Sequence, residues 1–163
     1  MGYDIGFLMP GQDDDRLSEE LPLLQLTNEQ EAAWRRIVAR AQQEIGAADE
    51  DRYPAHLELW LRDPAMQLCY AGNSASIEIP YRYTATAASA HAAIATAYAL
   101  AHIVEAETGM RGLDYEVNQA IQDNDLPRAV ARYRGVGQHV RDLVAGQGPD
   151  SRSSDRHGPS TGQ

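Results

Sequence analysis

The 163-residue chain contains no lysine and a single cysteine, Cys69, and these absences exclude several kinds of chemistry. Without lysine there is no Schiff-base residue, no phosphate-binding lysine of a nucleotide loop and no lysine general base. A single cysteine cannot form an intrachain disulfide or a cysteine-rich zinc site, and it is compatible with a reducing compartment. We therefore expect a cytoplasmic protein.

The short motifs that mark common active sites are also missing. The sequence has no glycine-rich phosphate loop, GxSxG, HExxH or CxxC. His91 and His102 would lie about 16 Å apart along a helix, too far to share a metal. The acidic residues 13–15, Glu19 and Glu20 lack the spacing of a calcium loop. We expect no catalytic residues, no metal and no cofactor.

Positive charge is scarce as well. The chain has 24 acidic and 14 basic residues, all of the latter arginine, for a net charge of −10. Such a chain repels nucleic acid and has no basic stripe that would bind it. A basic protein is the partner that this charge favours, because complementary potentials speed encounter. The alternative is that the acidic surface serves solubility only.

One long segment, residues 83–104, has no formally charged side chain. Its few strong aliphatics cannot offset the cost of His91 and His102 in a bilayer, so we do not expect it to span a membrane. Half of residues 87–106 are alanine, the best helix former, and small side chains allow close packing. The segment is predicted to be a core helix that ends at Gly109.

Two further helices are predicted from apolar spacing. The first begins with a capping box of Thr27 and Gln30 and continues to Gly46. The other covers residues 125–146, although two glycines weaken it. The alanine-rich helix between them is capped at its start by one of two threonines, Thr84 or Thr86.

Alternation of apolar and polar residues predicts the strands. They cover residues 3–9, 56–61, 66–71, 76–83 and, as a final strand, 111–117. With helices on one face of a mainly antiparallel sheet, the fold class is an α+β two-layer sandwich. We expect a single domain over residues 1–145, with an irregular loop at 10–26, an acidic linker at 47–54 and a disordered tail at 146–163.

The alternation also predicts a candidate partner-binding surface on the open sheet face. If helices cover the aliphatic side, the opposite side carries Asp4, His56, Glu58, Trp60, Glu78 and Arg82. Tryptophan and arginine dominate the energetics of protein interfaces. The alternative is that these residues have a structural role only: the third helix covers Trp60, or Arg82 pairs with Glu58 or Glu78. An alternative pocket between sheet and helices would use Tyr81, Tyr83, His91 or His102.

Three stretches carry a resemblance: "MGYDIGFL", "IEIPYRY" and "YALAHIVEAETG". They resemble a loose group of small uncharacterised bacterial proteins of actinobacterial type, with an N-terminal Tyr-Asp strand and a helix ending in Glu-x-Thr-Gly. That group continues with a Tyr-Asp-Pro-Gln stretch, whereas "GLDYEVNQ" here keeps only Asp114, Tyr115 and Gln119. The resemblance implies an α+β fold and a bacterial origin, and no activity.

Small size, acidity and the missing catalytic motifs favour a non-enzymatic protein-binding module, for example an immunity- or antitoxin-like inhibitor of a basic partner. Two alternatives stay open. In the first, the chain is a small-molecule-binding protein or an enzyme with a site between sheet and helices. In the second, it is a structural homo-oligomer built through the open sheet face.

Overall fold

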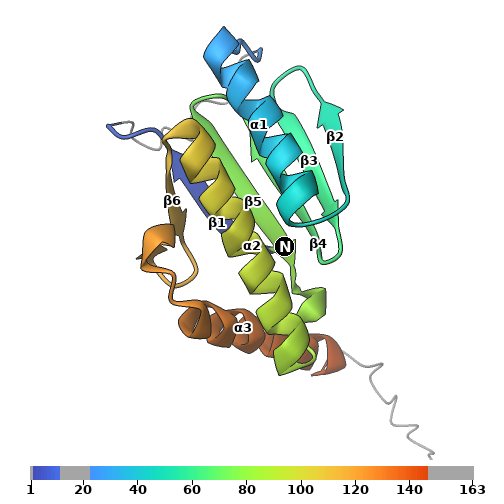
Figure 1. The fold of residues 1–163 in the computed structure, drawn as a ribbon. Helices are drawn as coiled ribbons and strands as arrows, with labels where there is room; N and C mark the ends of the chain where they lie inside the picture. The colour runs from blue at the N-terminus through green and yellow to red at the C-terminus, as the bar shows by residue number, and fades with distance from the viewer. Residues whose placement is uncertain (1, 12–22, 147–163) are drawn as a thin grey trace, which may run out of the picture.

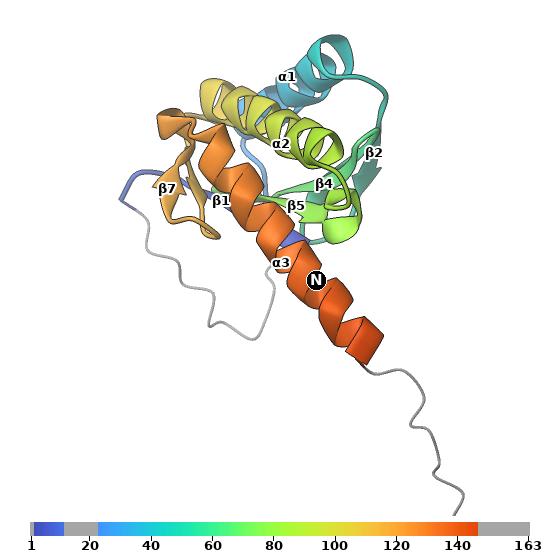
Figure 2. The same ribbon diagram turned by 90° about the horizontal axis from the view of Figure 1, so that it is seen from below.

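A seven-stranded antiparallel sheet forms one layer of the structure, a computed structural model that describes residues 2–11 and 23–146. The strands lie in the order β2-β3-β4-β5-β1-β6-β7. The helices lie on one face of this sheet (Figures 1 and 2), which confirms the predicted α+β sandwich. Most of the predicted loop at 10–26 and the predicted tail lie outside the described residues.

Short turns connect most of the strands, and the two connections that contain helices, from β1 to β2 and from β5 to β6, cross over other strands. The strand bounds are β1 (Gly2–Leu8), β2 (Ala48–Arg52), β3 (Leu57–Arg62), β4 (Ala65–Tyr70), β5 (Ser74–Pro80), β6 (Arg111–Asp114) and β7 (Gln119–Ala120). Strands β2 to β5 form a meander of neighbouring antiparallel pairs. Strand β1 pairs with both β5 and β6, so the first strand of the chain lies inside the sheet.

The helices begin and end at the residues that the sequence indicates. They are α1 (Asn28–Glu44), α2 (Ala87–Thr108) and α3 (Leu126–Gly146), with the 3₁₀ turns η1 (Tyr81–Tyr83) and η2 (Ile121–Asp123). Thr27 and Gln30 form the predicted capping box of α1. Of the two threonines, Thr86 caps α2, and Gly109 ends that helix with a φ of +73°, a conformation that glycine adopts without strain.

Helix α2 is the central helix of the apolar core. Of the described helices it is the one long and apolar enough to cross a membrane, but nine of its residues are buried in the protein, as expected of a core helix. It packs between α1 and α3 over the sheet (Figure 1). Alternate residues of β1, β3, β4 and β5 supply the other half of the core, among them Ile5, Leu59, Leu68 and Ile77.

Helix α3 closes the core at the end of the sheet where η1 follows β5. Its Tyr133 is buried, stacks on Tyr81 with ring centroids 5.4 Å apart and donates a hydrogen bond to the Pro80 carbonyl. Gly137 faces Thr84 so closely that a Cβ at this position would overlap the threonine side chain. The glycine is thus required for the close approach of α3, although it weakens the helix itself.

Three predictions about the strands were wrong. The acidic linker at 47–54 contains the edge strand β2, whose residues lack an apolar face. Its helix-side residues are instead held by polar contacts, as Glu50 accepts a hydrogen bond from the Trp34 indole at 2.7 Å. The predicted strand at 76–83 ends at Pro80, and η1 follows it. Likewise β6 is shorter than the predicted strand at 111–117.

Candidate functional site

The sheet face opposite the helices carries a polar row that crosses five strands. The register places Asp4, Glu78, Gln67, Trp60 and Asp49 directly beside one another on β1, β5, β4, β3 and β2. None of the three described helices lies on this face (Figure 2). Because residues opposite each other across a ladder share a face, the row forms one continuous strip of side chains.

The structure brings together the residues predicted for this face. Asp4, Glu58, Trp60 and Glu78 lie on its strands, and His56 lies immediately before β3. Arg82 reaches the face from η1, outside the sheet, with its guanidinium 5.6 Å from the centre of the Tyr83 ring.

Neither of the two structural roles considered for this face, a Trp60 covered by the third helix or an Arg82 paired with a glutamate, is found in the described part of the chain. Trp60 remains 41% exposed, so α3 does not cover it. Among the described residues, no ion pair joins Arg82 to Glu58 or Glu78.

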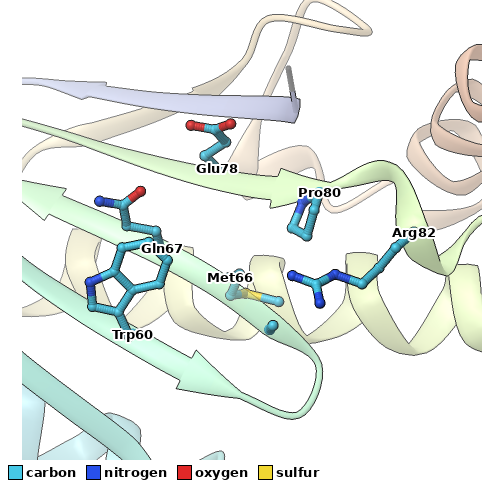
Figure 3. A pocket seen from close by; sticks show the side chains of 7 residues that line it. Trp60, Met66, Gln67, Glu78, Pro80 and Arg82 are labelled. Carbon is cyan, nitrogen blue, oxygen red and sulfur yellow. The ribbon is translucent and has the colours of Figure 1, made fainter. Parts of the chain in front are cut away.

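A shallow pocket of about 150 Å³ lies within this face. Its lining residues are Trp60, Ala65, Met66, Gln67, Glu78, Pro80 and Arg82 (Figure 3). Pro80 ends β5, and the chain then turns through η1, so that the Arg82 side chain extends back toward the strands. The pocket therefore has a carboxylate on one side, a guanidinium on another and an indole ring as an apolar wall.

Next to the pocket, the Glu58 carboxylate is held by its neighbours on the same face. Glu58 is only 8% exposed. The Trp60 indole donates a hydrogen bond to its Oε2 at 2.9 Å, and the His56 Nε2 lies 2.7 Å from its Oε1. The Tyr53 ring stacks on His56 at a centroid distance of 5.1 Å. These contacts fix the carboxylate, the imidazole and the indole relative to one another.

Cys69 completes this group from the neighbouring strand. It lies directly opposite Glu58, and its Sγ is 4.0 Å from the Glu58 Oε1. The thiol is half-buried on the open face. Burial, followed by the charges of Glu58 and Glu78, raises its pKa to about 11. The thiol is therefore protonated at neutral pH and is not an activated nucleophile.

The alternative pocket residues do not converge. Tyr81 stacks on Tyr133, whereas the Tyr83 hydroxyl accepts a hydrogen bond from the Ala65 backbone N–H at 2.7 Å. His91 and His102 are exposed on α2, and His102 lies 3.2 Å from the Asn124 side chain. The four side chains thus point to different surroundings.

A second polar cluster is buried on the helix side of the sheet. Asp114 is fully buried, and its Oδ2 accepts hydrogen bonds from Tyr3 at 2.6 Å and Tyr98 at 2.5 Å. Gln119 donates to the Tyr98 hydroxyl at 2.7 Å. Burial and the bond to Asp114 raise the pKa of both tyrosines. The cluster joins β1, α2, β6 and β7 and has a structural role, since its polar groups satisfy one another.

No protein-family model, curated protein or solved structure matches the chain.

Sequence reasoning missed two members of the site, Gln67 and Cys69, although a signal was present. The β3–β4 hairpin turns at residues 63–64, which fixes Glu58 opposite Cys69 and Trp60 opposite Gln67. Pairing the two alternating segments about this turn would have placed all four side chains on one face.

Proposed function

We propose that this chain is a non-enzymatic, acidic binding module of the cytoplasm, which inhibits a basic protein partner in the manner of an immunity protein or antitoxin. The partner binds the open sheet face and inserts one basic side chain into the pocket beside Trp60. The observation that carries this proposal is the exposed Trp60 indole in one pocket with Glu78, a carboxylate with no ion pair among the described residues.

Trp60 has the properties of an interface anchor. The residue is 41% exposed, yet its position is fixed by the hydrogen bond to Glu58. A large aromatic side chain that is already ordered loses little conformational entropy when a partner covers it. Its ring face also attracts a cation positioned above it, which favours an arginine or lysine of the partner.

The negative charge at the Glu78 side of the pocket also favours a basic group of the partner. Glu78 is exposed and lies opposite Asp4 in the ladder, so two carboxylates flank this side of the strip. A guanidinium bound to Glu78 would gain a charge-assisted hydrogen bond. Arg82 at the opposite side is then placed to donate to a carbonyl or carboxylate oxygen of the same partner segment.

The size of the pocket favours a side chain over a free ligand. Sites for cofactors and drug-sized molecules enclose roughly 300–1,000 Å³, whereas this pocket measures about 150 Å³ and opens on a sheet surface. A single protruding side chain fits that volume, and the rest of the strip provides the surrounding contacts.

The test is affinity capture from a lysate of the source organism, followed by calorimetry with the purified partner. Trp60→Ala is expected to weaken binding by about 2 kcal/mol, roughly 30-fold. Glu78→Gln is expected to weaken it by about 1 kcal/mol, with a loss of salt dependence. The matched control is Leu143→Ala, a 55% exposed side chain on α3 whose removal leaves binding unchanged.

The charge of the inserted group is decided by a second comparison. If the inserted group is basic, Glu78→Gln weakens binding more than Arg82→Gln, which removes only the hydrogen bond to the partner segment. The reverse pattern would contradict a basic partner. A dimer seen by light scattering and lost in Trp60→Ala would instead support the structural homo-oligomer.

A further inference from the structure

Three side chains with different metal-binding atoms converge beside the pocket. A ring nitrogen of His56, a carboxylate oxygen of Glu58 and the Cys69 Sγ all lie within 4.8 Å of one another. We propose that these three residues form a binding site for a zinc ion, with a water molecule as the fourth ligand. This site shares His56 and Glu58 with the open face proposed to bind a partner, but metal binding to it does not require the partner.

The separations of the three atoms suit a tetrahedral ion. Zinc–nitrogen and zinc–oxygen bonds of about 2.0 Å and zinc–sulfur bonds of about 2.3 Å place tetrahedral ligand atoms roughly 3.3–3.5 Å apart. In the structure, nitrogen and oxygen are 2.7 Å apart, and sulfur and oxygen are 4.0 Å apart. The observed distances lie on either side of the required value. Side-chain rotations that move the ligand atoms by up to about 1 Å therefore accommodate the ion.

The backbone that presents these ligands is rigid. Glu58 and Cys69 are opposite one another in the β3–β4 ladder, and His56 is two residues before Glu58 on the same face. Both strands lie inside the sheet, with a further strand on each side. A site built on paired strands holds its ligands in place before the metal arrives.

Groups outside the three ligands orient them further. The Trp60 indole donates to Glu58 Oε2 at 2.9 Å, which leaves Oε1 directed at His56 and Cys69. The Tyr53 ring lies against the imidazole, with an angle of 19° between the ring planes. Such outer contacts are characteristic of metal sites, where they fix the orientation of the ligands.

The donor set and the local charge favour zinc over magnesium or calcium. Imidazole nitrogen and thiolate sulfur suit zinc, whereas magnesium and calcium prefer oxygen ligands throughout. On binding, the Cys69 thiol releases its proton to solvent as the zinc–sulfur bond forms. The thiolate and the Glu58 carboxylate then balance the two charges of the ion. Asp51, opposite Glu58 on β2, adds negative potential that attracts a cation.

The experiment is a titration of the full chain, purified through a tag without histidine, with Co(II) and then with competing zinc. Cobalt reports on the ligands, because a thiolate-to-metal charge-transfer absorption requires a bound cysteine. We expect one equivalent of Co(II), a charge-transfer band, and displacement of the cobalt by one equivalent of zinc.

Variants then assign the ligands. Cys69→Ser should abolish the charge-transfer band, and His56→Ala should abolish stoichiometric binding. Trp60→Phe, which removes only an outer hydrogen bond, should weaken binding about tenfold. His91→Ala removes an exposed histidine on α2 and should change nothing. Glu78→Gln should retain the metal, which separates this site from the partner surface.

A measurement on the unaltered protein guards against variants that fail to fold. Bound zinc should slow the alkylation of Cys69 by iodoacetamide at least tenfold, and a chelator should restore the original rate. Alkylation at the same rate with and without saturating zinc would overturn the proposal. So would cobalt binding that survives in both Cys69→Ser and His56→Ala.

Discussion

Replacing Asp114 by alanine tests whether the buried polar cluster holds the second half of the fold together. The Asp114 carboxylate is fully buried and accepts the hydroxyl hydrogens of Tyr3 and Tyr98, as well as the Glu116 backbone N–H at 3.1 Å. Without the carboxylate, both hydroxyls lose their acceptor in the interior. The substitution therefore leaves two buried donors on two different elements, β1 and α2, without their partner.

The magnitude follows from the cost of each orphaned group. A buried donor left without a partner costs about 1–3 kcal/mol, so Asp114→Ala should lower the free energy of unfolding by roughly 2–6 kcal/mol. That is a large part of the 5–15 kcal/mol that is typical of a domain. Asp114→Asn keeps one oxygen for the hydroxyls and should cost less, about 1–2 kcal/mol.

Urea denaturation followed by circular dichroism measures these changes, as a shift of the midpoint at constant slope. The decisive comparison adds Tyr3→Phe and Tyr98→Phe to Asp114→Ala. The two hydroxyl donors are then removed, while one N–H of Gln119 loses its acceptor on Tyr98. Fewer buried donors are left unpaired, so the triple variant should be more stable than Asp114→Ala alone. A loss below about 1 kcal/mol for Asp114→Ala, or losses that simply add, would refute the reasoning.

Two further predictions concern α3 and alkaline pH. Gly137→Ala should destabilise the protein by about 1–3 kcal/mol in thermal unfolding, because the added Cβ overlaps Thr84. Gly135→Ala is the control: a Cβ there meets nothing within 4 Å, so this variant should stabilise the protein by up to about 1 kcal/mol. Equal effects of the two substitutions would contradict the close approach of α3 to Thr84. Burial raises the pKa of Tyr70 and of Tyr133 from 10.0 to about 12. The unfolded chain therefore loses these protons first, so stability should be constant below about pH 10 and fall above it, by roughly 2–3 kcal/mol per tyrosine near pH 12. Urea midpoints across this range should fall less steeply in Tyr70→Phe, and parallel curves would exclude that contribution.

Local patterns predicted most of the elements because the features that define them are close in sequence. The capping box of Thr27 and Gln30 and the terminal glycine of α2, Gly109, each depend on a few neighbouring residues. The two-residue period of β3 likewise placed Glu58 and Trp60 on the open face. Strand β2 escaped this reasoning because its stability comes from partners distant in sequence, such as the Trp34 indole that binds Glu50.

By itself, the sequence determined the α+β class, the helix-facing residues and the face on which Trp60 and Glu78 lie, since alternation along one strand decides these. Tertiary structure alone decided which side chains meet. The insertion of β1 between β5 and β6 brings Tyr3 to Asp114, and the turn after Pro80 brings Arg82 to the pocket. The β3–β4 pairing sets Cys69 against Glu58. Such contacts join residues up to 111 positions apart, and they form only when the whole sheet buries its apolar face against the helices.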